Sequence, residues 1–141
     1  MPASILLSIV ESPTHPDFTG LYRRLDLAET RVGSIRKAIS LLKSQPPDFV
    51  VAEFFYGYGN NYAGVNISNL DVFLYSLQKF APAARVVVMV EKTEYRHVDK
   101  LNGIITLHGV LQHPVREPAM EALLTAGPSR HSGGGVTGSS T

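Results

Sequence analysis

Glu53 is the residue of this 141-residue chain whose type and position best suit chemistry, because it ends a short, continuously apolar run. The run covers residues 49–52 and reads Phe-Val-Val-Ala, and Pro46 and Pro47 shortly before it end the preceding helical pattern. An apolar run without alternation is typical of a strand buried on both faces of a parallel sheet. Ligands bind at the carboxyl ends of such strands in open α/β sheets. The sequence therefore predicts one carboxylate at the functional edge of a sheet.

A segment rich in tyrosine, glycine and asparagine follows Glu53. Its tyrosines are Tyr56, Tyr58 and Tyr62, and its asparagines are Asn60 and Asn61. Tyrosine offers rigid, amphipathic contact area, whereas glycine and asparagine tolerate left-handed backbone, and loops of this length are often functional. Three interpretations stay open: the loop binds a partner protein, it binds a planar small molecule, or it is an ordered surface loop that only covers the sheet edge.

The absence of cysteine and the spacing of the five histidines limit the possible chemistry. Disulfide bonds, thiolate nucleophiles and cysteine-ligated metals are excluded. The sequence contains no His-x₃-His pair and no carboxylate cluster, so no metal site and no cofactor are predicted. We expect His97 and His108 to be solvated or to form local hydrogen bonds.

The composition predicts one soluble domain without a nucleic-acid or membrane partner. Hydrophobic residues make up 44% and charged residues 18% of the chain, and the formal net charge is +1. No apolar run approaches the roughly 20 residues that span a bilayer, and no basic segment precedes the first apolar run, so we expect a cytoplasmic protein. The domain is predicted to cover residues 1–126, and the Gly/Ser-rich residues 127–141 to form a flexible tail or linker.

Strands and helices are expected to alternate along this domain. Apolar or alternating runs predict strands at 4–10, 27–32, 49–53, 86–90 and 104–111. Apolar residues at helical spacing predict helices at 21–25, 35–42, 70–77, 93–101 and 118–124. Glu29 and Arg31 alternate with smaller residues, which indicates an edge strand. This order predicts an α/β fold, a flavodoxin-like, doubly wound sheet of five parallel strands in the order 2-1-3-4-5 with helices on both faces.

Two short motifs resemble the receiver domains of two-component response regulators. Residues 47–53 read Pro-Asp-Phe-Val-Val-Ala-Glu and are similar to the third strand of receivers, where the last residue is a phosphorylated aspartate. Residues 111–114 read Leu-Gln-His-Pro and are similar to the end of the fifth strand, where a lysine precedes the proline. The resemblance covers residues 4–126 and implies the CheY-like version of the flavodoxin-like fold.

The position that matches the receiver metal site has lost its acidic pair. Receivers hold Mg²⁺ with two acids after the first strand, and Ile9 and Val10 stand there, with only Glu11 beyond. Mg²⁺ requires oxygen ligands, which aliphatic side chains do not supply.

The other receiver positions are altered as well. Glu53 replaces the phosphorylated aspartate, Val90 replaces a hydroxyl residue after the fourth strand, and His113 replaces the lysine. Phosphoryl transfer depends on metal and fixed positive charge, so the chain resembles a pseudo-receiver. Glu53 either imitates a phosphorylated aspartate or is a plain polar strand end. A Glu53–His113 contact is expected, either as a structural pair or as a pH-sensitive one.

The resemblance to receivers and the altered site positions together imply a non-catalytic signalling domain. We expect it to act through protein–protein contact, independently of phosphorylation, on an unidentified signalling partner. The resemblance to receivers also implies a homodimer through the fourth helix, fifth strand and fifth helix. Two alternatives stay open: an atypical receiver that still accepts a phosphoryl group, and a flavodoxin-like module that binds a small ligand with residues 56–62.

Overall fold

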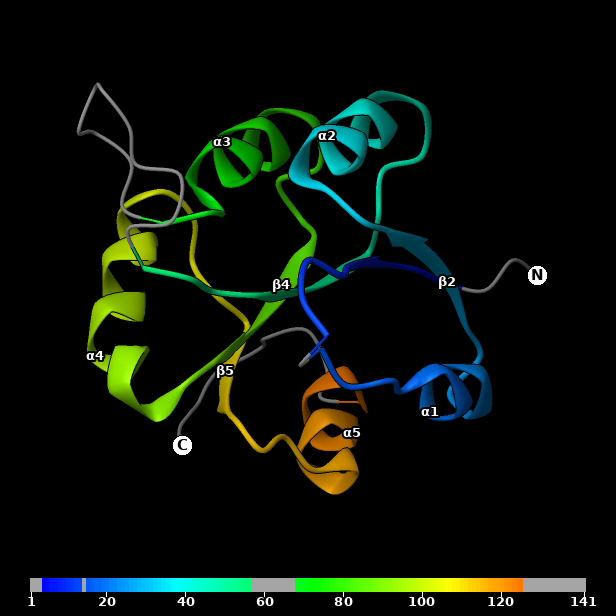
Figure 1. The fold of residues 1–141 in the computed structure, drawn as a ribbon. Coiled ribbons are helices and arrows are strands. Elements are labelled where there is room, and N and C mark those ends of the chain that lie inside the picture. Colours follow the sequence, from blue (N-terminus) through cyan, green and yellow to red (C-terminus); the bar gives the residue numbers. More distant parts are fainter. Residues whose placement is uncertain (1–3, 14, 57–67, 126–141) are drawn as a thin grey trace, which may run out of the picture.

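A five-stranded parallel sheet in the order β2-β1-β3-β4-β5 forms the centre of the molecule (Figure 1). The computed structural model describes residues 4–13, 15–56 and 68–125. The strands are β1 (Ser4–Ile9), β2 (Leu27–Val32), β3 (Phe49–Glu53), β4 (Arg85–Val90) and β5 (Gly109–Gln112). The sheet order confirms the predicted doubly wound, flavodoxin-like fold.

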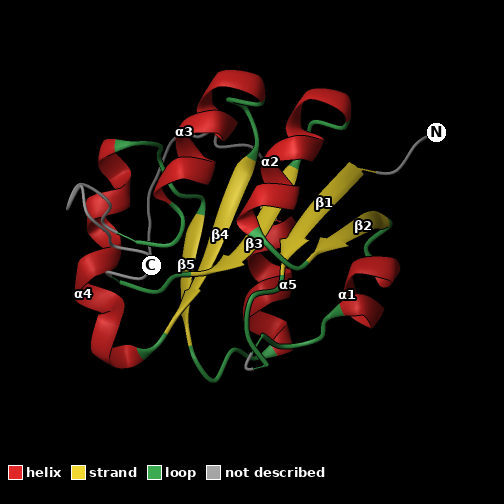
Figure 2. Ribbon diagram, turned by 45° about the horizontal axis from the view of Figure 1, so that its top comes forward, coloured by secondary structure: helices red, strands yellow, loops and turns green. Residues whose placement is uncertain are grey.

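The helices alternate with the strands and cover both faces of the sheet (Figure 2). The α-helices are α1 (Thr19–Arg24), α2 (Ile35–Ser44), α3 (Asp71–Phe80), α4 (Tyr95–Val98) and α5 (Glu117–Thr125). Two 3₁₀-helices, η1 (Lys92–Glu94) and η2 (Asp99–Gly103), flank α4. None of the described helices is long and apolar enough to cross a membrane.

Two apolar layers hold the helices to the sheet. The layer under α2, α3 and α4 contains buried residues such as Leu42, Phe73 and Leu101. The layer under α1 and α5 contains buried residues such as Leu21 and Met120. Fully burying a side chain of this size contributes about 1.5–3 kcal/mol, so these layers are the main source of stability.

The central strand β3 positions Glu53 because it is paired on both sides. Its five residues are all buried, as the continuous apolar run predicted. β1 and β4 pair with it in parallel, and Glu53 lies opposite Met89 of β4. The backbone then continues the ladder for one step, since the Phe54 N–H donates to the Met89 carbonyl oxygen at 2.9 Å. Glu53 is therefore held at the carboxyl edge of the sheet.

The last strand is shorter than the sequence suggested. A strand was predicted over residues 104–111, but β5 covers only Gly109–Gln112. Ile104 is buried in the layer under α4, and its N–H donates to the Leu101 carbonyl oxygen, so it belongs to the end of the helical segment. The apolar run at 104–107 therefore packs as a connection and does not pair.

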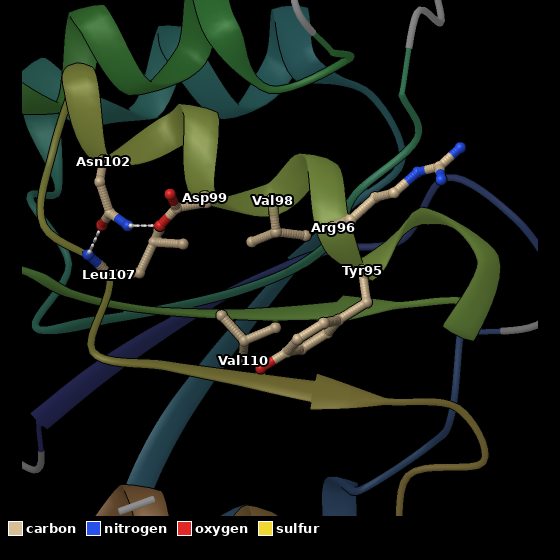
Figure 3. A pocket seen from close by; sticks show the side chains of 7 residues that line it. All are labelled: Tyr95, Arg96, Val98, Asp99, Asn102, Leu107 and Val110. Carbon is tan, nitrogen blue, oxygen red and sulfur yellow. Dashed lines mark hydrogen bonds between the residues drawn. The ribbon is translucent and has the colours of Figure 1, made fainter. Parts of the chain in front are cut away.

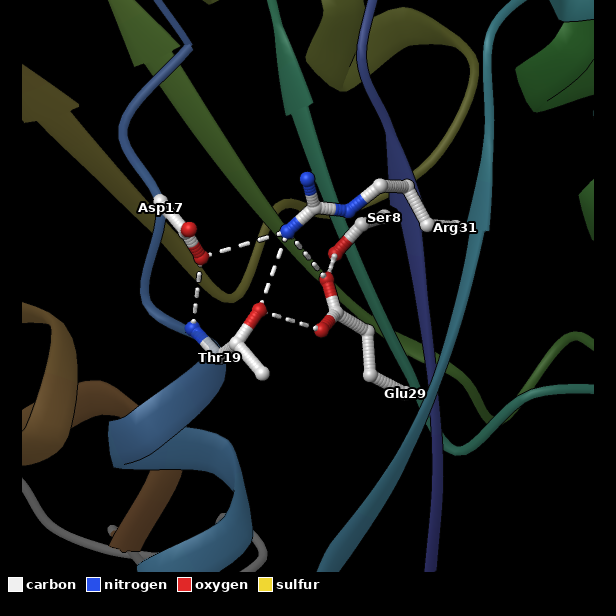
Figure 4. Close-up of polar contacts among 5 residues, drawn as sticks. All are labelled: Ser8, Asp17, Thr19, Glu29 and Arg31. Carbon is white, nitrogen blue, oxygen red and sulfur yellow. Dashed lines mark hydrogen bonds and ion pairs between the residues drawn. The ribbon is translucent and has the colours of Figure 1, made fainter.

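A polar network fastens the start of α1 to the edge strand β2 (Figure 4). The Glu29 carboxylate accepts hydrogen bonds from Ser8 Oγ at 2.8 Å and from Thr19 Oγ1 at 3.0 Å. Arg31 lies 3.2 Å from the Asp17 carboxylate. Hydrogen bonds from Thr19, with a smaller effect of Arg31, hold the pKa of Asp17 below its ordinary value. The charged alternation that indicated an edge strand is thus used to anchor a helix.

Candidate functional site

The Glu53 carboxylate is buried at the sheet edge and lies between two imidazoles. The whole residue is 1% exposed. Ser12 Oγ donates to Glu53 Oε1 at 2.9 Å, and His15 Nδ1 lies 3.7 Å from the same oxygen. His113 Nε2 lies 3.3 Å from Glu53 Oε2, which confirms the predicted Glu53–His113 contact. A buried carboxylate is stable only when such partners compensate for lost hydration.

Asn69 connects this carboxylate strand to a second acid, Glu11. Its Nδ2 donates to Glu11 Oε1 at 2.7 Å and to the Glu53 carbonyl oxygen at 2.9 Å. Its Oδ1 accepts the Phe55 N–H at 2.7 Å. These polar residues form one group, which we call the Glu53 cluster: Glu11, Ser12, His15, Glu53, Asn69 and His113.

The matched receiver positions contribute unequally to the site. Ile9 is fully buried in the layer under α2 and α3, and the Val10 N–H donates to the Val32 carbonyl oxygen. Val90 is 1% exposed, and its carbonyl oxygen accepts the backbone N–H of His113 at 2.9 Å, so it positions the His113 backbone. Ile9 and Val10 bring no oxygen to the site, so the residues present do not fit the oxygen shell of Mg²⁺. Within residues 4–13, 15–56 and 68–125, no group of three or more His, Cys, Asp or Glu side chains is arranged to hold a metal ion.

Tyr56 is held against α4 rather than over Glu53. Its ring stacks on the His97 ring with centroids 3.7 Å apart and planes 11° apart, and the Lys100 ammonium lies 5.4 Å from its centroid. The Tyr56 N–H donates to Glu94 at 3.1 Å. Tyr56 nevertheless remains 43% exposed. A rigidly held, exposed aromatic ring is typical of a contact residue.

Most of the predicted tyrosine-rich loop lies outside the described residues. This applies to Tyr58, Asn60, Asn61 and Tyr62, and to the tail from residue 127. Of the predicted loop residues, only Tyr56 can be placed in the structure.

A shallow cleft of about 430 Å³ opens beside the Glu53 cluster. It lies between the β1–α1 loop, the end of β4 and the end of β5, and its lining residues are Pro16, Glu91, His113, Pro114 and Val115. His113 thus belongs both to the buried cluster and to the cleft. Its side chain is 13% exposed, against 4% for His15, so it is the imidazole closer to solvent.

Glu11→Gln is expected to raise the melting temperature at pH 7.5, with no difference left near pH 4. Burial raises the pKa of the Glu11 carboxyl above its ordinary value; the Asn69 hydrogen bond opposes this, and the Glu53 charge adds to it. Because the folded state keeps this proton longer than the unfolded state, stability is lost as pH rises through the folded pKa. Glutamine removes that loss while its Oε1 still accepts from Asn69.

Thermal melts between pH 4 and pH 8 measure this difference. Glu91→Gln is the matched control, since Glu91 is an exposed carboxylate at the same sheet edge. A Glu11→Gln melting temperature equal to or below the wild-type value at pH 7.5 would contradict the expected cost of burying an ionised Glu11.

Sequence reasoning missed three members of the cluster. His15 lies in a proline-containing loop without periodicity, and its contact depends on the path of that loop. Ser12 has no signal other than its place after the first strand. Asn69 lies just before α3, where its residue type suggests only a helix cap. α3 begins at Asp71, its N-cap position is Leu70, and no side chain among the described residues caps it; the Ser68 hydroxyl accepts the Leu70 N–H at 3.0 Å.

Comparisons with known proteins show which solved structures share this architecture. No protein-family model matches the chain, and no curated protein matches it. Solved structures do match, although all three described here are distant in sequence. The signal receiver domain of an HD domain-containing protein from Pseudomonas fluorescens Pf-5 aligns with a TM-score of 0.63 at 12% identity, over 86% of this chain and 91% of that one. The described part of this chain has the receiver fold.

Two further receiver structures agree with this assignment. A response regulator receiver protein from Sinorhizobium medicae WSM419 has a TM-score of 0.62 at 18% identity and covers 87% of this chain and 91% of its own. A receiver domain protein from Clostridium thermocellum has a TM-score of 0.61 at 12% identity, over 86% and 90%. Sequence identities this low show a shared fold only. The chemistry of the Glu53 cluster follows from its own residues.

Proposed function

We propose that this chain is a receiver-like signalling domain that works through protein–protein contact and does not accept a phosphoryl group. The observation that carries the proposal is the burial of Glu53, which is 1% exposed and lies between Ser12, His15 and His113. A phosphoryl acceptor has to reach the phosphorus atom in line, with metal and fixed positive charge around the transferred group. The burial of Glu53 opposes such an approach, and Ile9 and Val10 cannot bind the metal.

The proposal is tested with Mg²⁺ and beryllofluoride, a mimic of the phosphoryl group. Amide NMR spectra of the ¹⁵N-labelled protein at fixed pH should be unchanged by their combined addition. Mg²⁺ alone is the control for general ionic effects. Saturable shifts at Glu53 and His113 that require beryllofluoride would show a working phosphoacceptor and would overturn the proposal.

The partner is expected to bind the surface around Tyr56. This surface combines the exposed Tyr56 ring with the His97 ring and the Lys100 charge. Few residues dominate most protein interfaces, and tyrosine is common among them. Tyr56→Ser is therefore expected to weaken partner capture at least about tenfold, since loss of an interface tyrosine often costs more than 1.4 kcal/mol.

Pull-down with the tagged protein followed by quantitative mass spectrometry measures this loss. Tyr75→Ser is the matched control, because Tyr75 is a tyrosine on α3 that is 59% exposed. Equal capture by both variants would place the contact surface elsewhere.

A second candidate surface lies between α4 and β5 (Figure 3). A pocket of about 360 Å³ is present there, and in Figure 3 the Tyr95 ring and Val110 approach each other at its floor. Asn102 closes one end through hydrogen bonds with Asp99 at 3.0 Å and the Leu107 N–H at 3.4 Å. This pocket belongs to the face on which the sequence predicts a homodimer, and the dimer stays a prediction. Analytical ultracentrifugation at tens of micromolar tests it, and a purely monomeric result counts against it.

A further inference from the structure

The Glu53 cluster contains two carboxylates and two imidazoles in a setting that excludes most water. Glu53 is 1% exposed, and the side chains of His15 and His113 are 4% and 13% exposed. His15 Nδ1 has no hydrogen-bond partner among the described residues, although it is buried and faces Glu53 Oε1 at 3.7 Å. A buried polar atom without a partner is uncommon and calls for an explanation. A protonated imidazole would supply one, because its N–H and its charge would both be directed at the carboxylate.

The charges of the cluster balance only when protons are bound. With both imidazoles protonated and both carboxylates ionised, the net charge of the cluster is zero. With both imidazoles neutral, Glu11 and Glu53 leave two negative charges in a poorly hydrated space, which is unfavourable. Asn69 is neutral and donates to the Glu11 carboxylate and to the Glu53 carbonyl oxygen, so it does not change this balance. Imidazole is the side chain that ordinarily changes charge between about pH 5 and pH 8.

Two other charged groups near the cluster, Glu91 and Asp17, are carboxylates and cannot supply the positive charge of these protons. Glu91, after β4, lines the same cleft as His113 and is exposed, and its negative charge adds to the demand for protons. Asp17, further along the β1–α1 loop, is paired with Arg31.

The two imidazoles belong to the loops that lead into α1 and α5. His15 precedes α1, which begins at Thr19, and His113 precedes α5, which begins at Glu117. The two helices are also joined to each other, since Arg24 of α1 contacts Glu117 at 2.7 Å and Glu121 at 3.4 Å. If the contacts between these loops and Glu53 weaken, the starts of both α1 and α5 are therefore affected, and with them the surface that the two helices share.

We propose that the Glu53 cluster is a proton-binding site. Bound protons hold the β1–α1 and β5–α5 loops against β3, and this contact sets the arrangement of the α1–α5 surface. This inference rests on the proposed function, because it names a proton in place of a phosphoryl group as the input to the same site. When protons are bound, His15 and His113 are both paired with Glu53. When they are released, both ties weaken, and the loops separate on either side of the cleft.

The test is an NMR titration of the full chain between pH 5 and pH 8.5, without Mg²⁺ or any phosphoryl mimic. Long-range ¹H–¹⁵N spectra follow the imidazoles, and amide spectra follow the helices. We expect the amides of α1 and α5 to move with pH in step with the His15 and His113 rings, while those of α2 and α3 move little. Glu53→Gln should remove most of the helix movement. His97→Gln is the matched control, because His97 stacks on Tyr56 outside the cluster, and it should leave the movement intact.

Two results would overturn the proposal. One is α1 and α5 amides that stay fixed while the two rings titrate. The other is a helix movement that survives in Glu53→Gln. If Glu53→Gln does not fold, His113→Gln is used instead. It should remove the movement of α5, and an unchanged α5 response would also overturn the proposal. Because no phosphoryl mimic is present, a titration without helix movement contradicts proton control alone. A beryllofluoride response at fixed pH instead contradicts the proposed function.

Discussion

Replacing His113 with leucine is expected to lower the free energy of unfolding by about 3 kcal/mol, the usual cost of removing one partner of a buried ion pair. The imidazole lies 3.3 Å from a carboxylate that is almost fully buried. Leucine has a similar size, so little packing is lost, but it leaves the Glu53 charge with fewer partners. Removal of one member of a buried pair is costly mainly because the other member stays buried and charged.

A second substitution separates this effect from packing. Glu53→Gln in the His113→Leu background should restore much of the lost stability, because a neutral amide does not need a counter-charge. Urea denaturation of the four species in this cycle measures the coupling. His97→Leu, the histidine control outside the cluster, is expected to cost less than about 1 kcal/mol. If the double variant is as unstable as the sum of the single ones, Glu53 and His113 do not act as a pair.

Asn69→Ala is expected to cost about 2–4 kcal/mol, since each buried group left without its partner costs about 1–3 kcal/mol. Asn69 is 9% exposed and serves three groups at once: the Glu11 carboxylate, the Glu53 carbonyl oxygen and the Phe55 N–H. Alanine removes both its donors and its acceptor. The change should also release the chain after β3, which carries Tyr56 to its place on α4.

The control for this change is Asn102→Ala, which removes an exposed asparagine with two hydrogen bonds. It should cost less than about 1 kcal/mol, because water replaces the lost partners. Denaturant unfolding gives both values. Asn69→Ala as stable as Asn102→Ala would show that the three bonds contribute little, and the cluster would then be held by its ion pairs alone.

The sheet could be predicted because its central strands are continuous apolar runs in the sequence. Residues 49–52 and 86–90 have no alternation, and both form strands buried on two faces. The alternation at Glu29 and Arg31 correctly indicated the edge strand β2. The start of the last strand was wrong, because the run at residues 104–107 is equally apolar whether it pairs with β4 or closes the end of η2.

The site could be predicted only where the strands themselves place it. Glu53 ends β3 and His113 follows β5, and these two strands flank β4. Topology alone therefore brings the two residues to the same sheet edge, and their contact is confirmed. His15 reaches Glu53 by the path of a loop, which no periodic pattern encodes. Asn69 looks like an ordinary residue near a helix start until its partners Glu11 and Phe55 are known. Loop paths and buried polar bridges therefore remain beyond sequence patterns.

The late position of α5 has a consequence for synthesis of the protein. The buried side chains of the apolar layer under α2, α3 and α4 end in sequence at Ile104, whereas the layer under α1 and α5 requires Met120 and Leu124. A chain that emerges from the ribosome amino terminus first can therefore close one side of its sheet while the other side still faces water. Until α5 has been synthesised and packs, the apolar side chains of Val51, Val87 and Met89 form an exposed hydrophobic surface of the kind that chaperones recognise.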